Sequence, residues 1–87
     1  MDKADIERDI RQFIADEFFF GRTDNLTGDG SLLGTVIDST GILVLVMYLQ
    51  EHFSITVEDS EVVPSNLDSV KNLADFVDRK LQSKASF

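Results

Sequence analysis

The sequence contains no cysteine or tryptophan, and only one histidine and one proline. Without a thiol, the chain can form neither a disulfide nor a thiolate metal site, and the single imidazole, His52, excludes a histidine-rich metal cluster. No stretch reaches the apolar length of a membrane span, and the charged N-terminus is unlike a signal peptide. We therefore expect a cytoplasmic protein that does not insert into membranes.

Positive charge is also scarce, and it is unevenly distributed. The chain has 16 acidic residues against 8 basic ones, which gives a net charge of −8, and no Lys or Arg occurs from residue 23 to residue 70. Nucleic-acid binding requires charge of the opposite sign and is excluded. An acidic middle suits partners with basic surfaces. The simpler alternative is that the acidic excess only keeps a small domain soluble.

Hydrophobic periodicity predicts an all-α four-helix bundle, with three main helices, a short third helix and a long loop before the second helix. At this length we expect a single domain over residues 1–87, whose last residues, 82–87, form a disordered tail. Pro64 is expected to end the short helix, and Asp68 or Ser69 to cap the last one. The predicted helices cover residues 4–20, 39–53, 58–63 and 70–81.

The predicted loop over residues 21–38 is rich in Gly, Asp and Asn, which is turn chemistry. Its Asp and Gly content invites comparison with a calcium loop, but the D-x-[DN]-x-[DN]-G register and its terminal Glu are absent, so we expect no metal site. A loop this long is usually functional or held down by apolar anchors. The candidate anchors are Leu26, Leu32, Leu33, Val36 and Ile37.

The predicted second helix is apolar on nearly all sides. Such a helix is either buried all round or offers a second apolar face to a partner, and a chain this short has few elements to surround it. We therefore expect a face that contacts a partner. The helical wheel places Leu45, Val46, Leu49 and Phe53 toward the core. It places Gly41, Val44, Met47 and Tyr48 toward the outside, with Leu43 at the boundary.

The sequence Asp38-Ser39-Thr40-Gly41 ends the loop and opens this helix. A serine at a helix start can present its hydroxyl to an incoming enzyme, and the N–H groups of the following turn favour an attached anion. On these four residues alone, a plain N-cap is the simpler interpretation of Ser39. A Ser-His hydrolase is excluded because His52 lies thirteen positions further along the same helix, roughly 20 Å along the axis.

The longer run DSTGILVLVMYLQEHFSITVEDSEVVP resembles the centre of an acyl carrier protein. It has the Asp-Ser pair, a helix rich in Leu, Val and Met that ends in Phe, then Ile-x-Val and an acidic short helix. The order of the helices and the long first loop are similar to the same family along nearly the whole chain.

The resemblance implies that Ser39 carries a 4′-phosphopantetheine arm. A phosphopantetheinyl transferase would install it from coenzyme A with a divalent metal, which Asp38 would help to position. The thiol of the arm would hold acyl or aminoacyl groups as thioesters, although the chain has no cysteine. The protein itself would supply no catalytic residue and no metal site.

The resemblance also implies further partners of a monomeric carrier in fatty acid or secondary metabolite biosynthesis. These are an acyl- or aminoacyl-activating ligase and downstream acyl-transfer enzymes. The chain departs from fatty-acid-synthesis carriers, because Thr40 and Gly41 follow the serine and Val44 stands where Glu is usual. It looks more like stand-alone carriers of amino acids or short acyl groups, including D-alanyl carriers.

The expected partner face consists of Thr40, Gly41, Leu43, Val44, Met47, Tyr48 and Glu51. An alternative interpretation is a carrier-fold interaction module that binds a partner through the same apolar helix and leaves Ser39 unmodified.

Overall fold

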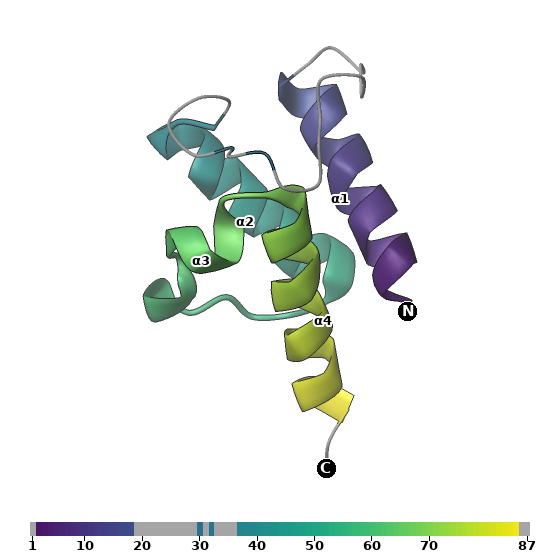
Figure 1. Ribbon diagram of the computed structural model, residues 1–87. Helices are drawn as coiled ribbons and strands as arrows, with labels where there is room; N and C mark the ends of the chain where they lie inside the picture. Colours follow the sequence, from purple (N-terminus) through teal and green to yellow (C-terminus); the bar gives the residue numbers. More distant parts are fainter. Residues whose placement is uncertain (1, 19–29, 31, 33–36, 86–87) are drawn as a thin grey trace.

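The computed structural model describes residues 2–18, 30, 32 and 37–85. Helices make up the regular structure of this part of the chain. Figure 1 shows their arrangement. The elements are α1 (Lys3–Phe18), α2 (Ser39–Phe53), a 3₁₀ turn η1 (Asp59–Glu61), α3 (Pro64–Leu67) and α4 (Val70–Ala85). The predicted all-α bundle with a short third helix is confirmed.

The centre of the bundle is the contact between α1 and α4, which lie against each other more extensively than any other pair of helices. Ile6, Ile10 and Ile14 recur every four residues along α1, and all three are completely buried. This spacing puts them on one side of the helix, where they meet the apolar side of α4. That side comprises Val70, Leu73, Ala74, Phe76 and Val77.

α2 contributes Leu45, Leu49 and Phe53 to the same core. It meets α4 over a much shorter stretch than α1 does. The helix ends at Ser54, whose backbone adopts the left-handed conformation, with φ 55° and ψ 45°. A left-handed residue at this position is a common way to terminate a helix, although glycine is more usual there than serine.

Two of the expected loop anchors, Leu32 and Ile37, are buried in the core, at 3% and 1% exposure. The Leu32 N–H donates a hydrogen bond of 2.6 Å to the carbonyl of Asp68, at the junction of α3 and α4. This contact fixes the chain shortly before α2 begins. The other expected anchors, Leu26, Leu33 and Val36, lie outside the described residues.

Two predicted boundaries are wrong. Pro64 opens α3 instead of ending the preceding turn, because a residue without an N–H loses no hydrogen bond at the first helical position. The expected disordered tail is helical as far as Ala85, the end of α4. No Gly or Pro interrupts this stretch, and the Gln82 side chain donates a 2.9 Å hydrogen bond to Asp78, one turn earlier. Residues 86–87 lie outside the described part of the chain.

Candidate functional site

Asp38 is the N-cap of α2. Its backbone is extended, with φ −88° and ψ −173°, and its Oδ1 accepts a hydrogen bond of 2.8 Å from the Gly41 N–H. The Asp38 carbonyl also accepts the first helical hydrogen bond, from Ile42 N–H at 2.9 Å. One side-chain oxygen therefore satisfies one of the four N–H groups that a helix start leaves without a helical partner.

Ser39 is the first residue of the helix, and it is exposed. The interpretation of Ser39 as the cap is wrong, since Asp38 fills that position. The hydroxyl therefore has no capping role and is accessible to a reagent. It also lies at the positive end of the helix dipole, where a covalently attached phosphate is favoured.

Gly41 is buried, which corrects the expectation that it lies on the outer face. A Cβ at this position would lie 3.0 Å from Ile37 Cγ2 and 3.1 and 3.2 Å from two ring atoms of Phe18. The first turn of α2 is thus covered by the end of α1 and by the residue that leads into the helix. Gly41 allows this close approach and belongs to the packing, not to a surface for partners.

The outer side of α2 carries an apolar strip of Leu43, Val44 and Met47, with exposed fractions of 66%, 38% and 58%. Leu43, which we expected at the boundary, is the most exposed of the three. Thr40 and Glu51 are also exposed and continue the strip toward the two ends of the helix, because residues three or four apart share one face. Val46, expected in the core, is only half-buried.

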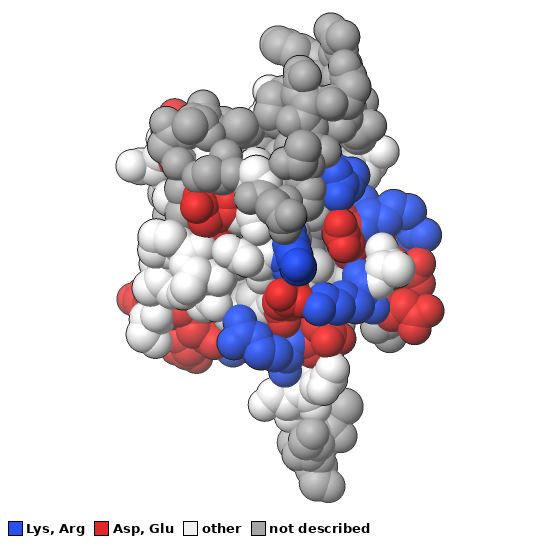
Figure 2. Space-filling view, viewed as in Figure 1, with Lys and Arg blue, Asp and Glu red and all other residues white. Residues whose placement is uncertain are grey.

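The basic side chains gather elsewhere on the molecule. In the view of Figure 2, Lys and Arg lie over α1 and α4, while uncharged and acidic residues cover the side of α2 and α3. This arrangement follows from the absence of Lys and Arg between residues 23 and 70. The strip on α2 therefore has acidic residues near it and no basic residue from its own segment.

Tyr48, the remaining member of the expected partner face, turns toward α1 and is half-buried. Its hydroxyl donates a 3.2 Å hydrogen bond to the Asp9 carbonyl, and its ring stacks on Phe13, with ring centres 3.8 Å apart and planes at 11°. Burial, assisted by the negative charge of Asp9, raises the pKa of Tyr48 to about 12. This residue connects two helices and is not part of the outer strip.

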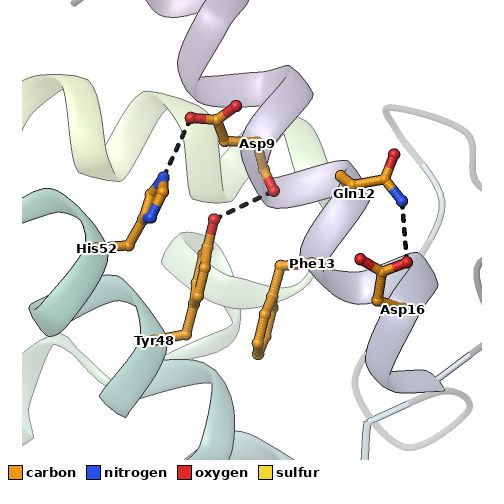
Figure 3. A pocket seen from close by; sticks show the side chains of 6 residues that line it. All are labelled: Asp9, Gln12, Phe13, Asp16, Tyr48 and His52. Carbon is orange, nitrogen blue, oxygen red and sulfur yellow. Dashed lines mark hydrogen bonds and ion pairs between the residues drawn. The ribbon is translucent and has the colours of Figure 1, made fainter.

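A pocket of about 260 Å³ lies beside this contact (Figure 3). His52 forms the far side of the ring stack, 4.9 Å from the centre of Tyr48, and its Nε2 lies 3.1 Å from Asp9 Oδ2. His52 is near the opposite end of α2 from Ser39, as the sequence spacing indicated. The pocket is lined by Asp9, Gln12, Phe13, Asp16, Tyr48 and His52.

Sequence reasoning missed this pocket. Asp9, Phe13 and Asp16 share one face of α1 by their spacing, and Tyr48 and His52 share one face of α2. The sequence therefore contained the spacing of the lining residues along each helix. What the sequence does not contain is the rotation of one helix relative to the other.

Within the described residues, no three His, Asp or Glu side chains come together in a way that could hold a metal ion. None of the described helices combines the length and the apolar character needed to cross a membrane. No protein-family model matches the chain, and no curated protein matches it.

Proposed function

We propose that this protein is a non-catalytic carrier, which holds acyl or aminoacyl intermediates as thioesters on a 4′-phosphopantetheine arm attached to Ser39. The observation that supports this most directly is the division of roles at the start of α2. Asp38 caps the helix, so the exposed Ser39 hydroxyl is available for covalent attachment without loss of the cap.

The residues present suit such a group. A phosphodiester on Ser39 Oγ would place its negative charge against the free N–H groups of the first turn of α2. The bound arm would supply the thiol that a chain without cysteine lacks. The Asp38 carboxylate is held beside the serine by its bond to Gly41 N–H, where we propose that it supports the attachment reaction.

We propose that the strip on α2 is where partner enzymes dock. The partners are a phosphopantetheinyl transferase, an acyl- or aminoacyl-activating ligase and downstream acyl-transfer enzymes of fatty acid or secondary metabolite biosynthesis in the cytoplasm. Leu43, Val44 and Met47 present apolar area, and Glu51 adds a negative charge at one end. A complementary surface would combine an apolar patch with basic residues at its rim.

The attachment is tested by intact mass measurement after incubation with coenzyme A, magnesium and a broad-specificity phosphopantetheinyl transferase. We expect the wild type to gain the mass of one phosphopantetheine and Ser39→Ala to gain none. Ser60→Ala is the matched control, because Ser60 is another exposed serine and should leave the gain unchanged. A folded wild-type protein that gains no mass would refute the carrier function.

A second candidate function is an unmodified interaction module that uses the same strip. The exposure of Leu43 and Met47 favours it, since large apolar side chains seldom cluster at a surface without a binding role. The rate of mass gain distinguishes the two. If the strip docks the transferase, Met47→Asp slows modification of a protein that stays folded, whereas Val63→Asp, an exposed apolar residue outside α2, does not.

A further inference from the structure

We propose that the pocket between α1 and α2 binds the guanidinium group of an arginine side chain on a partner protein. The pocket lies on a different side of α2 from the apolar strip, and its chemistry does not involve Ser39. The inference is therefore independent of the carrier function.

The wall of the pocket is a stack of three nearly parallel rings (Figure 3). Tyr48 is covered by Phe13 on one face, at 11° between planes, and by His52 on the other, at 14°. Phe13 is the end ring of this stack, and it is only half-buried, so part of its ring lines the pocket. A planar guanidinium can continue such a stack, with its positive charge against the negative face of the ring.

The polar groups beside Phe13 match the donors of that group. Asp16 Oδ1 accepts a 3.0 Å hydrogen bond from Gln12 Nε2, which holds both side chains over this side of α1. Figure 3 shows the other carboxylate oxygen of Asp16 turned toward Phe13. The Asp16 carboxylate is therefore the acceptor that faces Phe13, and a guanidinium carries five N–H donors and no acceptor.

Asp9 lies at the opposite end of the pocket and has less capacity to accept hydrogen bonds from a ligand, because its carboxylate already pairs with other groups. It lies 3.1 Å from His52 Nε2 and 3.5 Å from Arg8 Nη2. We therefore assign the direct contact to Asp16, which Gln12 holds in place, and to Asp9 only a supporting negative charge.

The size and charge of the pocket favour a side chain over other ligands. About 260 Å³ is less than the volume of most sites for drug-sized molecules and suits one extended side chain. The net charge of −8 attracts cations and repels anions. A lysine ammonium satisfies the charge but cannot stack flat on Phe13, so arginine is the better fit.

The test is a titration of the Ser39→Ala protein with the peptide acetyl-Gly-Arg-Gly-amide at fixed ionic strength. Tyr48 is the only tyrosine and the chain has no tryptophan, so intrinsic tyrosine fluorescence reports directly on this pocket. The ring signals of His52, the only histidine, give a second reading by NMR. We expect saturable changes with the arginine peptide, smaller ones with the lysine peptide and none with the citrulline peptide, which has the same shape without the charge.

Matched variants identify the contacts. Asp16→Asn should weaken binding of the arginine peptide by roughly two- to fivefold, as expected for an exposed ion pair. Asp59→Asn makes the same charge change on an exposed residue of η1 and should leave binding unchanged. Phe13→Leu, checked for folding by circular dichroism, should remove the preference for arginine over lysine. Equal responses to the arginine and citrulline peptides, or equal effects of the two Asp variants, would overturn the proposal.

Discussion

The division of roles between Asp38 and Ser39 predicts that two neighbouring residues respond very differently to substitution. Asp38→Ala removes the oxygen that accepts from Gly41 N–H at 2.8 Å and leaves that donor to water. Ser39→Ala removes a hydroxyl that takes no part in the cap. Asp38→Asn is the intermediate case, because it keeps an oxygen acceptor and loses only the charge.

The expected sizes follow from the geometry. Loss of a well-formed N-cap costs about 1 kcal/mol, within a range of about 0.5–2 kcal/mol. The favourable interaction of the Asp38 charge with the helix dipole adds about 0.3 kcal/mol, since the residue is exposed. Asp38→Ala should therefore lower Tm by about 5–10 °C in a domain of this size, and Asp38→Asn by much less. Ser39→Ala should stay within about 0.5 kcal/mol of the wild type.

Urea unfolding followed by the helical circular dichroism signal measures all three variants under one condition. Asp38→Ala should have the lowest free energy of unfolding, while Ser39→Ala and Asp38→Asn should both stay close to the wild type. If Ser39→Ala were as destabilising as Asp38→Ala, the serine would be the cap. Its hydroxyl would then not be available for attachment without loss of the cap.

Three further predictions concern packing and ionisation. Gly41→Ala should destabilise the fold, because overpacking costs about 1–3 kcal/mol and the gain in helix propensity is at most about 1 kcal/mol. Urea unfolding measures the difference, and a stabilised variant would show that Ile37 and Phe18 move aside freely. Hydrogen bonds from the Glu58 N–H and, to a smaller extent, from Lys80 lower the pKa of Glu61 below its usual 4.5. The ionised carboxylate therefore stabilises the fold fully above pH 4.5, and this stabilisation is lost as the pH falls through the lowered pKa. The stability difference between wild type and Glu61→Gln should shrink over that range, and a constant difference would contradict this. Because the pKa of Tyr48 is raised to about 12, the folded state should lose stability as the pH rises from 10 to 12. The midpoint of the tyrosine absorbance titration should shift toward the usual value of 10 when urea unfolds the protein.

The start of α2 and its buried side could be predicted from the sequence, because both carry local signals. Asp38 marks the start, and the spacing of Leu45, Leu49 and Phe53 identifies the side that faces the core. The continuation of α4 past residue 81 could also have been predicted, since residues 82–85 contain no Gly or Pro that would stop a helix. The expected tail gave too much weight to the position of these residues at the end of the chain.

Features that depend on two separate segments could not be predicted in the same way. The burial of Gly41 requires Ile37 and Phe18 to meet above the first turn of α2, and a helical wheel contains neither. The pocket requires α1 and α2 to present particular faces to each other, which is decided by how both pack on the core. Local patterns specify faces of helices, whereas tertiary packing specifies which faces meet.

The uneven attachment of the helices has a consequence for local unfolding. α1 and α4 lie against each other extensively, whereas α2 meets α4 over a short stretch and connects with α1 through side chains such as Tyr48. Segments with fewer contacts open at lower free energy than the whole molecule, and their amide hydrogens exchange sooner. We expect the slowest exchange in α1 and α4 and faster exchange in α2. We therefore expect α2, which begins at Ser39, to separate from the bundle at a lower free energy than α1 or α4.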